Sequence, residues 1–135
     1  MGQRRAHSRM CGRIWDMMSD EEVGDLATYD IYKWYGSQWD VPCDQRTLAQ
    51  VLLRSSMFRR VAWEYKGERH EHLANLTSHE VYQYKGYSKS TLVAVWRPRT
   101  LDDIIQPYVE AKHTLRPLKN MPKFIRDAVK EAFFR

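Results

Sequence analysis

The stretch of sequence that decides the fold is DQRTLAQVL, residues 44–52. Asp44 is a favourable helix N-cap, because its carboxylate can accept hydrogen bonds from the first free backbone N–H groups of a helix. Apolar residues then recur with the spacing of one helical face: Leu48, Ala49, Val51, Leu52 and Leu53. This pattern predicts a helix with one buried face that ends near Arg54-Ser55-Ser56.

Upstream of this stretch, Ser19-Asp20-Glu21-Glu22 has the pattern of a capping box, which marks the start of a helix. It predicts a first helix that ends at Gly36 and buries the apolar positions Val23, Leu26, Ala27, Ile31, Trp34 and Tyr35. Between the two helices, residues 38–42 predict a brief edge strand, since Pro42 excludes it from the centre of a sheet.

Downstream, the periodicity changes from helix to strand. A short helical turn is expected over Met57–Arg60, then a strand over Val61–Tyr65 and a turn over Lys66–Glu68. Residues 81–84 alternate like a strand, and Thr91–Trp96 is the strongest strand pattern of the chain, ended by Pro98. Residues 69–80 favour either a loop or a helical turn.

The last third of the chain predicts helices. Thr100 begins one that Pro107 bends or divides, and Asn120 caps a final helix with Pro122 in its first turn. The final helix has a single apolar stripe, which either closes the core or forms a homodimer seam through Ile125, Val129 and Phe133. The full stripe is Met121, Ile125, Ala128, Val129, Ala132 and Phe133.

Length and composition indicate one intracellular domain. The chain has 135 residues, of which 43% are hydrophobic and 29% charged, and it contains two cysteines. No apolar run is long enough for a membrane helix, and two distant cysteines exclude a disulfide-dense scaffold. Taken together, the predicted elements indicate a single domain with an α+β fold.

Positive charge is concentrated at the two ends. The net charge is +5, and residues 1–13 carry Arg4, Arg5, Arg9 and Arg13 without any acidic residue. We expect residues 1–13 to form a basic, flexible arm that either contacts DNA or is merely solvated, residues 14–99 the main domain, and residues 100–135 a helical extension.

The middle of the chain resembles a winged helix-turn-helix domain over about residues 19–99. Residues 44–52 resemble its capped second helix, residues 57–61 the entry to the first wing strand, and residues 92–97 the returning strand. The resemblance implies a winged-helix core and binding of double-stranded DNA, as a transcriptional regulator or DNA-associated accessory factor. Only about two turns fit between Leu53 and Val61, so the recognition helix would be short and the wing, residues 66–90, long.

Candidate nucleic-acid contacts are the cations and amides near the second helix, in the wing turn and in the arm. Arginine and lysine contact phosphates, and glutamine can also bind base edges. The residues are Arg4, Arg5, Arg9, Gln45, Arg46, Gln50, Arg54, Arg59, Arg60, Lys85 and Lys89. Two alternatives remain: a protein–protein module that uses the fold as a scaffold, and a subunit of an RNA or multi-protein assembly.

No motif favours an enzyme. His70, His72 and His79 form the only cluster with metal-binding side chains, and their spacing matches no metalloenzyme signature. Phosphate-binding loops and nucleophile motifs do not occur in the sequence. We therefore expect no catalytic site, no metal and no cofactor.

Overall fold

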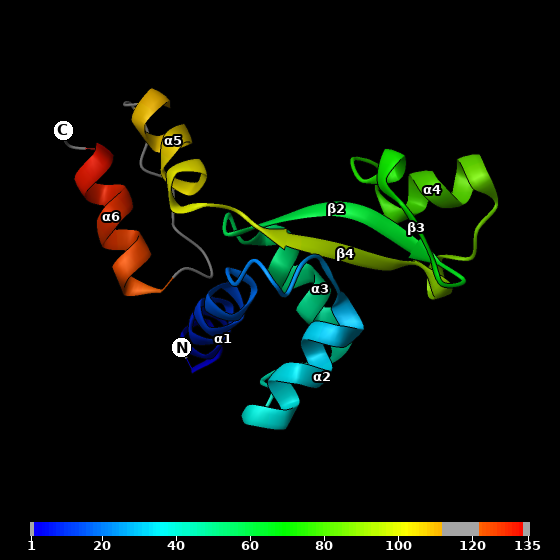
Figure 1. The fold of residues 1–135 in the computed structure, drawn as a ribbon, viewed down its shortest axis with the longest axis horizontal. Helices are drawn as coiled ribbons and strands as arrows, with labels where there is room; N and C mark the ends of the chain where they lie inside the picture. Colours follow the sequence, from blue (N-terminus) through cyan, green and yellow to red (C-terminus); the bar gives the residue numbers. More distant parts are fainter. Residues whose placement is uncertain (1, 112–121, 134–135) are drawn as a thin grey trace.

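The computed structural model describes residues 2–111 and 122–133 and has an α+β fold, as the sequence predicts (Figure 1). The described residues form one four-stranded sheet, six α-helices and two 3-10 turns. The strands are β1 (Leu26–Ala27), β2 (Phe58–Tyr65), β3 (Glu68–His70) and β4 (Val93–Pro98). The helices are α1 (Gly2–Met18), α2 (Thr28–Gln38), α3 (Gln45–Arg54), α4 (Ser78–Lys85), α5 (Leu101–Ala111) and α6 (Lys123–Phe133), and the 3-10 turns are η1 (Glu71–Leu73) and η2 (Lys89–Thr91).

The sheet is antiparallel, with strand order β1-β4-β2-β3. Central β4 pairs Val95 with Ala27 on one side and with Ala62 on the other. The predicted turn after β2 is confirmed: Lys66 has φ 50° and Gly67 φ 82°, and two successive positive φ angles are typical of a tight hairpin turn. Figure 1 shows α1, α2 and α3 on one side of the long β2–β4 ribbon, with α5 and α6 at one end and α4 at the other.

The predicted strands within β2 and β4 are confirmed, but the helical turn expected over residues 57–60 is wrong. β2 already begins at Phe58, which pairs with Pro98 of β4. A bulge between Arg60 and Ala62 shifts the register of this pairing. Pairing with a strand more than thirty residues later decided the structure, and no local pattern contains that information.

The helix predicted from Asp44 is confirmed as α3. The Asp44 carboxylate accepts a hydrogen bond of 2.7 Å from the backbone N–H of Thr47, and Leu48, Val51 and Leu52 are buried. Leu53, which was expected to be buried with them, is 51% exposed and lies on the outer side of the helix.

The N-terminal segment is not a flexible arm in its described part. Residues 2–18 form α1, and Met10, Cys11, Ile14 and Met18 are buried in the main core. These residues recur with helical spacing between the arginines, so α1 has one apolar face despite its charge. The first helix of the domain therefore precedes Ser19.

Residues 19–25, predicted to begin a helix, instead form a turn. The Ser19 hydroxyl donates to the carbonyl oxygen of Trp15, and the Glu22 N–H donates to Asp20. The following helix, α2, begins at Thr28 and continues through Gly36 to Gln38. The edge strand predicted over residues 38–42 is likewise absent, because Gln38 ends α2 and the next four residues form no strand.

The strand-like residues 81–84 belong to α4. Thr77 and Glu80 form its capping box: the Thr77 hydroxyl accepts from the Glu80 N–H, and the Glu80 carboxylate accepts from the Thr77 N–H. Gly86 ends the helix with φ 70°. These two reciprocal hydrogen bonds stabilise a helix at residues where the apolar–polar alternation had predicted a strand.

The C-terminal helices pack on the same core. Thr100 caps α5, as predicted, since its hydroxyl accepts from the Asp103 N–H, whereas Pro107 lies inside α5 and does not divide it. In α6, Ile125 and Val129 are fully buried within the chain. A second copy of the chain therefore cannot contact them, and the prediction of a homodimer seam is wrong for these two residues.

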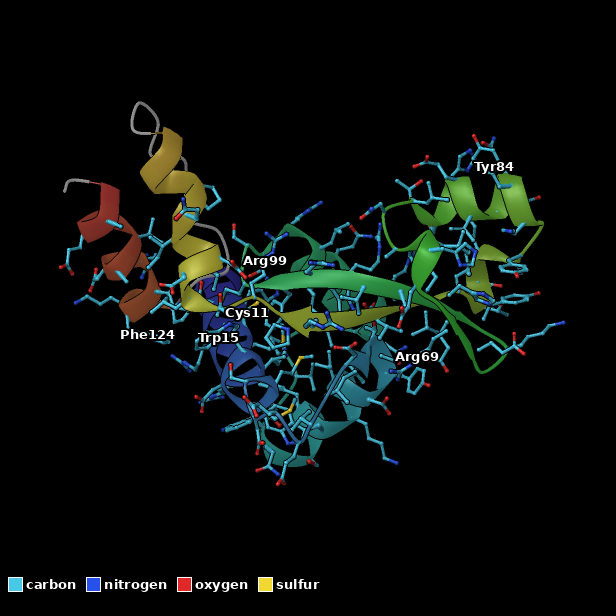
Figure 2. All side chains as sticks on the ribbon, turned by 45° about the horizontal axis from the view of Figure 1, so that its top comes forward. Cys11, Trp15, Arg69, Tyr84, Arg99 and Phe124 are labelled. Carbon is cyan, nitrogen blue, oxygen red and sulfur yellow. The ribbon has the colours of Figure 1, made fainter. Side chains whose placement is uncertain are left out.

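The α6 helix also contacts the first helix. The Phe124 ring lies 6.3 Å from the ring of Trp15, whose indole N–H donates to the carbonyl oxygen of Arg99 (Figure 2). The expected cap Asn120 lies outside the described residues, as does the side chain of Phe133. No helix in the described part of the chain has the length and apolarity needed to cross a membrane.

Candidate nucleic-acid interface

The outer face of α3 carries the best-formed group of predicted site residues. Because Leu48, Val51 and Leu52 hold the opposite face in the core, Arg46, Gln50 and Arg54 are exposed. They follow one another at four-residue spacing and so lie on one side of the helix. This side spans about 12 Å along the helix axis, at 1.5 Å per residue.

The charge of this face is positive. The ten residues of α3 contain two arginines and no acidic residue. Asp44 stands just before them, and its pKa is lowered by the hydrogen bonds it accepts from Thr47 and, to a smaller extent, by nearby Arg46. Its carboxylate therefore binds the N-terminus of α3, next to exposed Gln45.

Arg60 has a structural role instead of a place on this surface. Its Nε donates to the carbonyl oxygen of Ala74 at 3.0 Å, its Nη2 donates to that of Leu76 at 2.7 Å, and its Cζ lies 4.5 Å above the Trp63 ring. Burial lowers the pKa of the guanidinium. Arg60 thus fastens the segment before α4 to β2, which the sequence could not indicate.

Arg59 lies on the other side of the sheet from α3. It pairs with Arg97 across β2 and β4, and strand alternation puts both on the face opposite Trp96, which packs in the main core with α3. Arg97 forms a two-pronged ion pair with Asp25, with both N···O distances 2.9 Å. Arg59 is exposed, and it has no such ion pair among the described residues.

Neither predicted wing lysine is in a hairpin turn, although Tyr87 between them stacks on Tyr65 beside one. Lys85 is in the last turn of α4 and Lys89 begins η2, whereas the hairpin turn is at Lys66 and Gly67. Both lysines are exposed at the end of the ribbon where α4 lies (Figure 1). The long wing is folded: it contains β3, η1, α4 and η2.

Of the N-terminal arginines, Arg9 is exposed on α1, while Arg4 and Arg5 lie in the first turns of that helix and their side chains are outside the described set. One turn after Arg9 lies Arg13, which the sequence did not single out as a site. Its Nη1 donates to the Tyr35 hydroxyl at 3.1 Å, and its Cζ lies 4.2 Å above the ring of Trp39.

Arg9 and Arg13 border a hollow of about 250 Å³ that is open to solvent. Its other polar and aromatic lining residues are Tyr35, Trp39 and Asp40. The hollow lies between α1 and the connection from α2 to α3. The one available sequence signal was the spacing of Arg5, Arg9 and Arg13 along a helix, which is visible only when residues 2–18 are read as helical.

Two of the three clustered histidines, His70 and His72, take part in ring packing. The Tyr65 and Tyr87 rings stack at 4.0 Å, and the His70 ring lies 5.6 Å from Tyr87 and 5.9 Å from His72. These contacts hold the segment after α4 against the β2–β3 hairpin. Among the described residues, no three histidine, cysteine, aspartate or glutamate side chains are grouped to hold a metal ion.

Both cysteines are free thiols. Burial raises the pKa of Cys11 to about 12 and also raises the pKa of half-buried Cys43. A thiol needs its thiolate form to act as a nucleophile, and a raised pKa disfavours that form.

No protein-family model, curated protein or solved structure matches this chain. Its function therefore has to be inferred from its own residues.

Proposed function

We propose that the chain is a winged-helix protein that binds double-stranded DNA through α3, as a transcriptional regulator or DNA-associated accessory factor. The order of elements supports this proposal. Helix α1, strand β1, helices α2 and α3, and the pair β2 and β4 follow each other along the chain, and β4 lies between β1 and β2. Three helices on an antiparallel ribbon of this kind are typical of the winged-helix class.

In this proposal the recognition helix is α3, and α2 is its partner in the helix-turn-helix. The sequence had instead indicated a truncated recognition helix after Leu53, because the first helix was expected at Ser19. With α1 as the first helix, α3 is a full ten-residue helix in the position expected of the recognition element. The insertion between β2 and β4 then takes the place of the wing.

One observation carries the proposal: Arg46, Gln50 and Arg54 form an exposed, acid-free stripe on α3. Arginine binds phosphate or the major-groove edge of guanine, and glutamine can bind adenine through two hydrogen bonds. The stripe is about 12 Å long, similar to the width of the major groove. Arg59 and Arg60 have no part in this interface, because one lies across the sheet and the other is used inside the fold.

The test compares Arg46→Gln and Arg54→Gln with the matched control Arg59→Gln, which removes the same charge from the opposite face. Binding to a labelled mixed-sequence duplex is measured by fluorescence anisotropy at several chloride concentrations. Each α3 substitution should weaken binding and reduce the slope of log affinity against log salt by about one. The control should leave both unchanged.

A salt slope near zero for the wild type, or equal losses for Arg46→Gln and Arg59→Gln, would contradict the proposal. Competition with a structured RNA tests the alternative of an RNA-binding subunit. If the RNA displaces the labelled duplex from the protein more effectively than unlabelled duplex DNA does, the chain is an RNA-binding or nucleoprotein subunit.

A further inference from the structure

We infer that the hollow between α1 and the α2–α3 connection binds a phosphate group of the duplex backbone. This inference rests on the proposed function and extends its contact surface from α3 to α1. The residues that would hold the phosphate are Arg9 and Arg13, with Trp39 as the wall of the hollow.

Arg13 is already held in place by two neighbouring side chains. The Tyr35 hydroxyl accepts one of its five N–H groups, and the Trp39 ring covers one face of the guanidinium. The Trp39 ring is itself held by Trp34 and Tyr35, whose centroids lie 5.7 and 5.1 Å away. A guanidinium ordered before binding loses little further entropy when the ligand arrives.

Charge and volume suit a phosphate. Arg9 and Arg13 lie one helical turn apart on α1, and neither has an ion pair to an acidic side chain in the described part of the chain. Of the lining residues that the structure describes, Asp40 is the one acid, so the two arginines exceed it by one charge. A volume of about 250 Å³ equals that of roughly eight water molecules, which is sufficient for a phosphate and part of its hydration shell.

The hollow is within reach of DNA that contacts α3. Pro42 lines it, and only two residues separate Pro42 from Gln45, the first residue of α3. Their Cα atoms are therefore at most about 11 Å apart. Successive phosphates of one strand rise about 3.4 Å along the duplex, so a backbone beside the α3 N-terminus passes this distance within a few nucleotides.

The experiment has two arms. In the first, duplex binding is measured against chloride concentration for Arg9→Gln, Asp40→Asn and the control Lys130→Gln on α6. Arg9→Gln should weaken binding about tenfold at roughly 0.1 M salt and lower the slope by about one. Asp40→Asn removes the opposing charge and should strengthen binding severalfold, while Lys130→Gln should change neither quantity.

In the second arm, inorganic phosphate is added to the free protein, and the indole N–H signal of Trp39 is followed by NMR. The signal should shift in the wild type and move much less in Arg9→Gln. Arg13→Gln should also abolish the shift, and a preserved spectrum elsewhere separates this effect from unfolding.

The two proposals fail in different ways. If the α3 substitutions weaken duplex binding but Arg9→Gln and Asp40→Asn do not, the phosphate site is wrong and the α3 interface stands. If phosphate shifts Trp39 but the protein does not bind the duplex, the α3 interface is wrong and the hollow takes a free phosphate ligand. An unmoved Trp39 signal together with unchanged duplex binding by Arg9→Gln overturns the inference outright.

Discussion

Thr28 joins the first turn of α2 to the centre of the sheet through two hydrogen bonds. The indole N–H of Trp96 donates to the Thr28 hydroxyl at 2.9 Å, and this hydroxyl donates to the carbonyl oxygen of Ala94 at 3.1 Å. All three residues are buried. A buried polar group without a partner is costly, so this one hydroxyl satisfies two groups that water does not reach.

Thr28→Val should therefore lower the free energy of unfolding by about 1–3 kcal/mol, since valine keeps the volume but removes the hydroxyl. Thr28→Ser keeps the hydroxyl and should cost less than Thr28→Val. Urea unfolding followed by tryptophan fluorescence measures both. A Thr28→Val protein as stable as the wild type would show that the buried N–H finds another partner.

Cys11 couples stability to alkaline pH. Its pKa is raised to about 12 by burial, against 9.0 for an ordinary thiol, so the folded chain keeps a proton that the unfolded chain loses above about pH 9. The stabilisation from this protonated thiol is complete below pH 9 and is lost as the pH rises from 9 towards 12. The free-energy difference between the wild type and Cys11→Ala should therefore shrink over that range.

Chemical denaturation at a series of alkaline pH values measures this difference, with Cys43→Ala as the less buried comparison. A gap between wild type and Cys11→Ala that stays constant or widens with pH would contradict the assignment. The same burial should leave Cys11 unreactive towards thiol reagents until the chain unfolds.

At the scale of elements, α1 combines two properties on one helix. Met10, Cys11 and Ile14 fill the core, while Arg9 and Arg13 border the open hollow. This is an amphipathic helix whose polar face is strongly cationic. The same helix is therefore a structural element of the fold and, in our proposal, part of the surface that contacts DNA.

The neighbouring substitutions Met10→Ala and Arg9→Ala separate the two properties of α1. Met10 has no exposed surface, so Met10→Ala should lower the free energy of unfolding by about 2–5 kcal/mol. Exposed Arg9→Ala should change it by less than about 0.5 kcal/mol. Thermal or urea unfolding measures both, and equal, negligible effects would mean that this segment behaves as the flexible arm that the sequence indicated.

For the whole molecule, folding does not gather the predicted cations into one surface. Arg46 and Arg54 lie on α3, Arg59 lies across the sheet, and Lys85 and Lys89 lie in α4 and η2. Our proposal therefore rests on a smaller area, the α3 stripe and the adjoining hollow. The paired experiments on Arg46 and Arg59 test this division directly.

The sequence by itself determined the elements that local chemistry specifies. Asp44 and the apolar spacing after it predicted α3, alternation predicted most of β2 and β4, and Lys66-Gly67 predicted the turn. Caps, periodicity and turn residues act over a few positions, so they can be recognised in the sequence alone.

Only the tertiary structure decided which residues share a surface. The guanidinium of Arg13 lies over the ring of Trp39, which is 26 positions away in the sequence. Arg60 donates hydrogen bonds to carbonyl groups 14 and 16 positions away, and β2 begins at Phe58 because β4 pairs with it. These contacts depend on the packing of segments distant in sequence, and burial there outweighs the local preference that had indicated an arm and a recognition turn.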